Sequence, residues 1–254
     1  MLHPLIARVA PILIFAGLSA TATAVAGAPT PDEILKAVDN AVGGMADQYF
    51  ITEMTTDEPG KASRTLTLEV TIKGSDWRRI EFLAPGDVKG TRILVLSTDQ
   101  TYIYLPAFRK IRRIATHLKE QGFMGSAWDN DDFSLATYGK VFEAEAVTDH
   151  DKYYTLALKR RAGVDFLYPR IEVDARKDGM QPIEIRYFND VGATVKTETR
   201  TVFVCQAGLC IPKVVVIVDH TRADIKTTMT IKDWKVNRGV PDSFFTIRAL
   251  QRGE

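Results

Sequence analysis

Histidine and cysteine are scarce in this 254-residue sequence, which contains four of the first and two of the second. Only His117, His150 and His220 lie beyond the N-terminal segment, and they are widely spaced. Neither the H-E-x-x-H pattern of zinc hydrolases nor the G-x-S-x-G pattern of serine hydrolases occurs. We therefore expect a protein that is not an enzyme and needs no cofactor, although distant residues can still assemble an active site.

An excess of charge of either sign is also absent. The chain has 33 basic and 32 acidic residues, and its first 26 residues include Arg8 but no acidic residue. Without that segment the formal net charge is zero. Because binding to nucleic-acid phosphates requires a net basic face, this balance argues against nucleic acid as a partner.

The N-terminal apolar stretch, residues 9–18, is shorter than the roughly 20 residues that a membrane-spanning helix needs. It follows Arg8 and leads to small residues ending in Ala24-Val25-Ala26, which is the order of a secretory signal peptide. A membrane anchor is the less favoured alternative. We expect cleavage after Ala26 to remove residues 1–26 and to leave residues 27–254 as one exported, soluble domain.

The two cysteines, Cys205 and Cys210, bracket Gln-Ala-Gly-Leu between strand-like runs at residues 199–204 and 211–218. A four-residue hairpin loop would place them opposite each other, and an oxidising compartment favours a disulfide, which contributes roughly 2 kcal/mol. A metal pair and a redox dithiol are the alternatives. The hairpin has no histidine and the spacing is not C-x-x-C, so a structural disulfide is the favoured interpretation.

Hydrophobic periodicity predicts one helix followed by many strands. Thr30-Pro31-Asp32-Glu33 fits a capping box with proline at the first helical position, and Gly43-Gly44 should end the helix. After that, apolar residues alternate with polar ones in short runs separated by turn-forming residues. About eleven strands are expected, which would form one antiparallel sheet that must curl or close. The expected strands are residues 65–73, 77–83, 92–96, 102–105, 141–147, 153–158, 170–175, 183–188, 199–204, 211–218 and 225–234.

Residues 116–138 interrupt this strand pattern with a short helix expected at 116–120 and a second one at 129–138. The interruption carries an unusual number of large apolar residues, which would cover either the sheet's own core or a ligand. Its acidic run from Asp129 to Asp132 does not fit a calcium loop, because Ser134 and Lys140 stand where glycine and glutamate are needed. A helix start stabilised by acidic side chains is the better interpretation.

One segment concentrates basic charge: Arg109, Lys110, Arg112 and Arg113. These side chains are expected to contact acidic lipid headgroups or an acidic partner surface. The alternative is a solvated strand end whose charges are balanced by the acidic run at residues 129–132.

The order of several segments resembles the LolA-like outer membrane lipoprotein-sorting proteins over residues 59–251. The segments that carry the resemblance are GDVKGTRIL, YIYLPAFRKIRRI, FMGSAWDNDDF, CIPKVVVIVDH and VPDSFFTIRAL. The resemblance implies a mainly β fold: an incomplete, strongly curved antiparallel β-barrel with an N-terminal helix and a short helical lid. It also implies an apolar cavity for acyl chains and a periplasmic location. In the best-studied carriers an early-strand arginine ties the lid shut, but neither Arg78 nor Arg79 can be assigned that role from the sequence.

The strand pattern supplies candidate walls for such a cavity, although a one-residue error in register would invert the face. The expected cavity residues are Leu66, Leu68, Val70, Ile72, Ile80, Phe82, Tyr102, Tyr104, Ile225, Met229 and Ile231. The expected lid residues are Phe123, Met124, Trp128 and Phe133. Each of these residues could equally be ordinary core, because pockets and cores use the same residue types.

The resemblance implies a carrier that shields acyl chains during lipoprotein or lipid sorting to the outer membrane. Its partners would be lipid or lipoprotein acyl chains, with an inner-membrane exporter of the resistance-nodulation-division (RND) type or a lipoprotein transporter as protein partner. The alternative is a non-catalytic periplasmic accessory protein of such an RND-type exporter, which would carry no lipid.

Overall fold

The computed structural model describes residues 28–75, 77–97, 100–114, 122–129, 132, 135 and 137–253. The expected signal peptide at residues 1–26, the expected helix at 116–120 and the lid residue Phe133 lie outside the described residues. None of the helices in the described part of the chain has the length and apolar character needed to cross a membrane.

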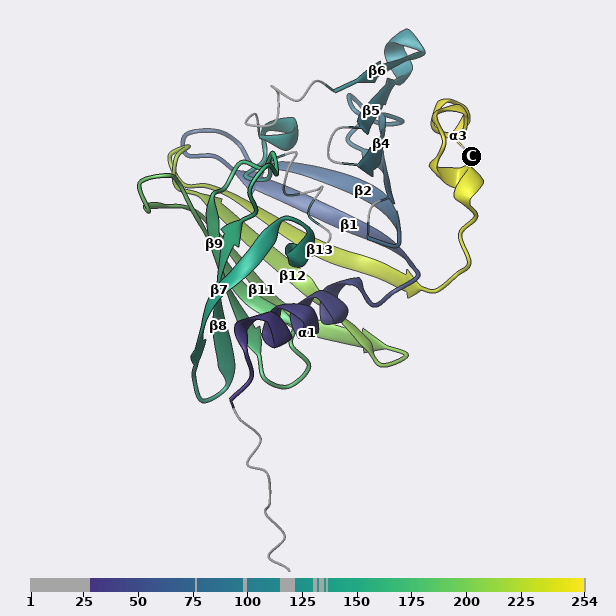
Figure 1. Ribbon diagram of the computed structural model, residues 1–254. Helices are drawn as coiled ribbons and strands as arrows, with labels where there is room; N and C mark the ends of the chain where they lie inside the picture. Colours follow the sequence, from purple (N-terminus) through teal and green to yellow (C-terminus); the bar gives the residue numbers. More distant parts are fainter. Residues whose placement is uncertain are drawn as a thin grey trace, which may run out of the picture.

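One antiparallel sheet dominates the fold and curves strongly around a concave inner face (Figure 1). In the described part of the chain it has 13 strands, in the order β6-β5-β4-β3-β2-β1-β13-β12-β11-β10-β9-β8-β7. The strands are β1 Asp47–Asp57, β2 Arg64–Lys73, β3 Trp77–Ala84, β4 Arg92–Ser97, β5 Gln100–Leu105, β6 Lys110–Arg113, β7 Phe142–Asp149, β8 Tyr153–Arg160, β9 Arg170–Arg176, β10 Pro182–Phe188, β11 Thr194–Gln206, β12 Leu209–Asp219 and β13 Ile225–Val236. The mainly β architecture expected from the sequence, an incomplete and strongly curved antiparallel barrel, is confirmed.

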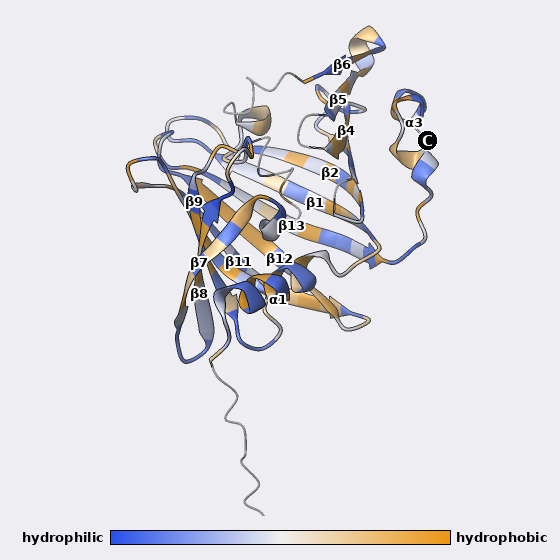
Figure 2. Ribbon diagram, viewed as in Figure 1, coloured by the Kyte–Doolittle hydropathy of each residue, from blue (hydrophilic) through white to orange (hydrophobic). Residues whose placement is uncertain are grey.

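The sheet is an unclosed barrel whose edge strands, β6 and β7, are consecutive in the chain. Sheets of this size curl because each strand is twisted relative to its neighbour, and register shifts such as the one at Ile51/Thr52 in β1 add local bending. Hydrophobic and hydrophilic bands alternate along β1 and β13, as a sheet with one buried face requires (Figure 2).

Two strands beyond the expected eleven complete the sheet. Strand β1 was missed because its sequence, DQYFITEMTTD, is mostly polar and lacks regular alternation. Strand β6 was missed because only Ile111 interrupts its basic residues. Both pair with neighbours through backbone hydrogen bonds, so their formation depends on the adjacent strands more than on their own residues.

Helix α1 (Pro31–Gly43) has the expected capping box: Glu33 N donates to Thr30 Oγ1 at 3.3 Å, and Thr30 N donates to Glu33 Oε2 at 2.8 Å. The helix packs against β7, β8 and β12 on the concave side of the sheet (Figure 1). The Asp39 carboxylate accepts the N–H groups of Tyr138 and Gly139, which anchors the short helix η4 (Tyr138–Lys140) to α1.

Three groups of apolar side chains form the core. The first core cluster joins α1 to β7–β10 and includes Leu35, Phe142, Leu156 and Ile185. The second core cluster lies on the inner faces of β1–β4, β12 and β13, and the third lies on the outer face, where the C-terminal segment returns. Members of the second are Met54, Leu66, Leu68, Val70, Ile80, Phe82, Ile93, Val95, Phe123, Ala127, Trp128, Val215, Ile217 and Ile225. The buried members of the third are Leu94, Phe245 and Leu250.

The C-terminal segment turns back at Asp47, whose carboxylate accepts the N–H groups of Arg238, Gly239 and Val240 at 2.7, 2.8 and 3.2 Å. It continues as the short helices η5 (Asp242–Phe245) and α3 (Ile247–Arg252), and α3 packs against β4, β5 and β6. The outer face of these strands is therefore covered by the chain itself.

The cysteines form the expected disulfide, with an S–S distance of 2.00 Å, across directly paired positions of β11 and β12. The strands run further than the sequence indicated, and only Ala207 and Gly208 form the turn. Both have positive φ, 52° and 77°, as a tight primed hairpin turn requires.

Candidate functional site

Between β6 and β7, residues 122–129 lie against the inner face of the sheet, and we call these residues together with Asp132 the lid segment. Phe123 and Trp128 are buried in the second core cluster, and the Phe123 ring stacks on Phe82 with centroids 5.9 Å apart. Met124 packs against the same cluster. Ala127 N donates to Thr227 Oγ1 of β13 at 2.8 Å, so the lid segment also has a polar contact with the sheet.

The described residues of the lid segment contain little helix. Phe123–Gly125 forms a single 3-10 turn, η3, in which Met124 has φ 51°. Of the described residues in the helix expected at 129–138, Asp132 is α-helical, whereas Asp129, Leu135 and Thr137 are not. The acidic side chains that were expected to begin a helix, Asp129 and Asp132, also contact a buried lysine.

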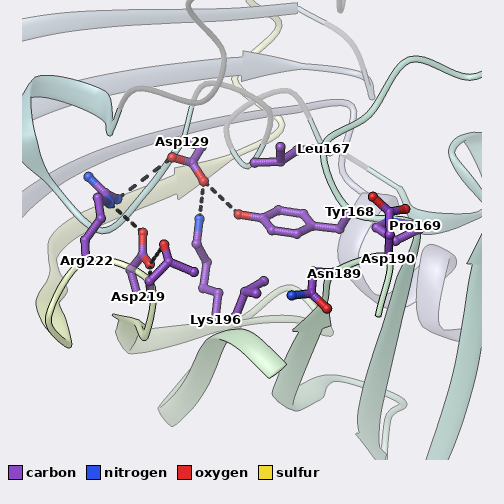
Figure 3. A pocket seen from close by; sticks show the side chains of 11 residues that line it. Asp129, Leu167, Tyr168, Pro169, Asn189, Asp190, Lys196, Asp219 and Arg222 are labelled. Carbon is purple, nitrogen blue, oxygen red and sulfur yellow. Dashed lines mark hydrogen bonds and ion pairs between the residues drawn. The ribbon is translucent and has the colours of Figure 1, made fainter. Parts of the chain in front are cut away.

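That lysine, Lys196 of β11, is 1% exposed and lies at the centre of a buried ionic cluster (Figure 3). Its Nζ donates to Asp129 Oδ2 at 2.5 Å and to Asp132 Oδ2 at 2.7 Å. Tyr168 donates its hydroxyl to Asp129 Oδ2 at 2.7 Å. We call Lys196, Asp129, Asp132 and Tyr168 the lid latch, because the two aspartates belong to the lid segment and the other two residues to the barrel.

A pocket of about 370 Å³ borders the latch and is lined by Asn189, Thr221 and Arg222 as well as by Asp129, Tyr168 and Lys196 (Figure 3). Arg222 pairs with Asp219 at 2.6 Å and approaches Asp129 Oδ1 at 3.9 Å. The latch thus borders two hollows: Asp129, Tyr168 and Lys196 line this pocket, and Asp132 lines the apolar cavity described below.

Burial raises the pKa of Asp132 to about 6, since the loss of solvation and the nearby Asp129 outweigh the attraction of Lys196. Burial alone would lower the pKa of Lys196, but the two carboxylates raise it. The lysine therefore keeps its charge, and a proton taken up on acidification goes to Asp132. Burial also raises the pKa of Tyr168, whose hydroxyl stays protonated and donates to Asp129.

The difference between the pKa of Asp132 in the folded protein and in the unfolded chain predicts a pH-dependent contribution to stability. As the pH falls from 7.5 to 5, folded Asp132 (pKa about 6) takes up a proton before the unfolded chain does (3.8). The wild type should therefore gain about 1 kcal/mol of unfolding free energy relative to Asp132→Asn, which has no carboxyl to titrate. Urea unfolding of both proteins at the two pH values measures the gain, and a constant difference would show that Asp132 stays ionised.

An apolar cavity of about 230 Å³ lies on the concave face between α1, the inner faces of β2 and β3, and those of β12 and β13. Its volume is below the roughly 300–1,000 Å³ of typical small-molecule pockets. A ligand larger than this volume would require the cavity to widen.

The expected wall residues of β2, β3 and β13 all lie on the concave face. Leu68, Val70, Ile72, Ile80, Met229 and Ile231 line the cavity. Leu66, Phe82 and Ile225 lie in the second core cluster. The structure therefore brings nine of the eleven expected wall residues together on one face.

The other two, Tyr102 and Tyr104, lie on the outer face, so their expected place on the cavity wall is wrong. They pack against the third core cluster beneath Phe245, while Ile103 between them points inward. Both faces of β5 carry apolar side chains, so alternation alone did not show which face is the inner one. The sequence did not reveal that the C-terminal segment would cover the outer face.

The sequence pattern missed the polar part of the cavity. Arg78 lines it from β3, and Glu198 and Arg200 line it from β11. Arg200 pairs with Glu198 at 2.5 Å, and Tyr187 donates to the same glutamate at 3.0 Å. Arg79, the neighbour of Arg78, faces outward and lies 4.2 Å from the centroid of the Phe244 ring.

Lys196 was also missed, because its strand, TVKTETRTVFVCQ, reads as a largely solvated one. Nothing in its immediate sequence distinguishes a buried lysine from an exposed one. The basic residues that the sequence analysis singled out are exposed on the β5–β6 hairpin: Arg109, Lys110, Arg112 and Arg113. Within the described residues, no group of three or more His, Cys, Asp or Glu side chains is placed to hold a metal ion.

A family model described only as an uncharacterized protein matches residues 74–252. The chain belongs to this family. No curated protein matches the sequence. Among solved structures, a DUF1329 family protein from Desulfovibrio piger is 22% identical with a TM-score of 0.79, over 88% of this chain and 100% of that one.

Two further solved structures share the fold of this chain. A putative outer membrane lipoprotein-sorting protein domain from Vibrio parahaemolyticus is 21% identical with a TM-score of 0.77, over 88% of this chain and 98% of that one. A LolA superfamily protein from Nitrosomonas europaea is 18% identical with a TM-score of 0.73, over 87% and 100% of the two chains. The family member described here therefore has the LolA-like fold.

Proposed function

We propose that the protein is a periplasmic carrier that shields acyl chains of a lipid or lipoprotein during sorting to the outer membrane. The observation that carries this proposal is an apolar cavity on the concave face, next to a lid segment whose own apolar side chains are buried. The shared fold with a putative outer membrane lipoprotein-sorting domain supports it.

The energetics of acyl chains explain why such a cavity is useful. Each buried CH₂ group that enters water costs about 0.8 kcal/mol, so one long acyl chain faces a barrier on the order of 10 kcal/mol. A dry cavity removes most of that barrier while the carrier crosses an aqueous compartment. Catalysis has no part in this function.

The lid latch suits reversible opening. Phe123 and Trp128 make apolar contacts that a bound acyl chain can replace at little cost. The ionic contacts of Lys196 are different. They have a defined geometry, and an acyl chain cannot replace them, because each carboxylate would lose the cation that compensates its charge. The latch would therefore favour a closed lid when the cavity is empty and would release it when acyl chains displace the apolar contacts.

The small volume of the closed cavity favours a second candidate function. A protein whose interior accepts no acyl chain would instead fit a non-catalytic accessory role beside an RND-type membrane exporter. The two candidates differ in one property, the presence of a bound lipid.

Lipid content tests the proposal directly. Native mass spectrometry and organic-solvent extraction of the exported protein should reveal a co-purified lipid, and that lipid should displace a fluorescent fatty acid from the protein. Protein that contains no lipid in either measurement, does not bind the fatty acid, and forms a stable complex with an exporter would establish the accessory role instead.

A further inference from the structure

The β5–β6 hairpin and the C-terminal helix α3 form one surface, although they are far apart in the sequence. Leu250 of α3 packs with Ile111 of β6 in the third core cluster, which fixes the two elements side by side (Figure 1). Exposed residues of the two elements make up what we call the docking surface, in which Lys110 and Arg112 lie on the face of β6 opposite Ile111: Phe108, Arg109, Lys110, Arg112, Arg113, Ile247, Arg248 and Arg252.

The docking surface is strongly basic on a nearly neutral protein. Its six basic side chains are all exposed, and neither residues 106–114 nor residues 247–253 contain an acidic residue. The whole chain, in comparison, has 33 basic and 32 acidic residues. The positive charge of this surface is therefore a local concentration that attracts an anionic partner.

Apolar side chains are exposed beside these charges. Phe108 is 66% exposed and Ile247 is 44% exposed, and they are two of the four large hydrophobic residues exposed in the described part of the chain. Exposed aromatic and aliphatic groups among basic residues are typical of surfaces that bind the interface of an anionic bilayer. An acidic protein would complement the charges but would leave Phe108 without an apolar environment.

The backbone presents Phe108 at the tip of the hairpin. Pro106 begins the short helix η1 (Pro106–Phe108), and Arg109, with φ 50°, turns the chain back into β6. The hairpin rises from one end of the molecule, apart from the concave face of the barrel (Figure 1). Phe108 can therefore reach a flat surface before the rest of the barrel does.

We propose that the docking surface binds the anionic headgroups of a lipid bilayer, with Phe108 and Ile247 entering the interface. This inference concerns an outer surface and does not depend on the occupancy of the cavity.

Vesicle binding tests the inference. The wild type should sediment with phosphatidylcholine vesicles that contain about a quarter phosphatidylglycerol, and much less with pure phosphatidylcholine; high salt should weaken the binding. The double variant Arg112→Gln/Arg248→Gln should lower partition into the anionic vesicles about 30-fold. Phe108→Ser should also lower it, with less dependence on salt.

The control is Lys152→Gln/Lys213→Gln, which removes two exposed charges outside the docking surface and should leave partition unchanged. Equal effects of both double variants, or equal binding to neutral and anionic vesicles, would overturn the inference. Failure to bind anionic vesicles would also overturn it and would favour an acidic protein partner.

Displacement of a fluorescent fatty acid, measured without vesicles, separates this inference from the carrier function. Arg112→Gln/Arg248→Gln should bind the fatty acid as the wild type does. A protein that binds anionic vesicles but no fatty acid would overturn the carrier function and leave the docking surface established.

Discussion

Replacing Lys196 by methionine is expected to lower the free energy of unfolding by about 3–5 kcal/mol, because two carboxylates would remain buried without their cation. Both aspartate side chains are at most 5% exposed, so water cannot replace the lysine unless the lid segment moves away. The lid segment should therefore open more often, and a bound fluorescent fatty acid should exchange faster. Urea unfolding and stopped-flow displacement measure the two effects.

Lys226→Met is the matched control for this prediction. Lys226 also pairs with an aspartate, Asp57, but both side chains are more than 40% exposed. Such surface pairs contribute about 0–1 kcal/mol, so this variant should unfold and exchange ligand like the wild type. If Lys196→Met is no less stable than Lys226→Met, the latch does not hold the lid segment.

Removing the carboxylates together with the lysine should reverse much of the loss. The triple variant Lys196→Met/Asp129→Asn/Asp132→Leu has no unpaired buried charge, so it should be more stable than Lys196→Met alone. It should still exchange ligand faster than the wild type, since the ionic contacts that close the lid are gone. This combination separates the cost of a buried charge from the closing function of the latch.

Met229→Asp is expected to weaken fatty-acid binding about 10- to 100-fold. Met229 lines the cavity from β13, and a carboxylate there would replace contacts worth about two or three buried CH₂ groups. Because Met229 is half-buried and borders open space, the variant should remain folded. Direct titration with a fluorescent fatty acid measures the affinity, and circular dichroism verifies the fold.

Thr228→Asp provides the control on the same strand. Thr228 is also half-buried, but it precedes Met229 and so points to the opposite face of the sheet. Its variant should bind the fatty acid normally. If Met229→Asp binds as tightly as Thr228→Asp, the acyl chain does not occupy the apolar cavity on the concave face.

Features that depend on neighbouring residues were predictable from the sequence. The capping box at Thr30 and Glu33 formed as expected, because both partners lie within one turn of helix. The pairing of Cys205 with Cys210 also followed from a short spacing between two strands. Regular alternation in β2 correctly placed Leu66, Leu68 and Val70 on one buried face.

Features that depend on distant segments were not predictable. Tyr102 and Tyr104 alternate with polar residues or Ile103 as cavity residues would. They lie on the outer face of the sheet, however, and the C-terminal segment returns over them and buries that face. Strand β1 has little alternation of its own, yet two neighbouring strands pair with it along almost its whole length. Nothing near Asp132 in the sequence indicates that its carboxylate pairs with a buried lysine 64 residues away.

The sequence by itself determined a β-rich chain with an N-terminal helix, a disulfide hairpin and an apolar segment between two strands, because period, caps and spacing are local properties. Tertiary structure alone decided where that apolar segment is held, which face of β5 is covered and where the cavity lies. Those outcomes depend on how a thirteen-stranded sheet curves, since curvature brings β11 opposite β3 and places Lys196 within reach of the lid segment.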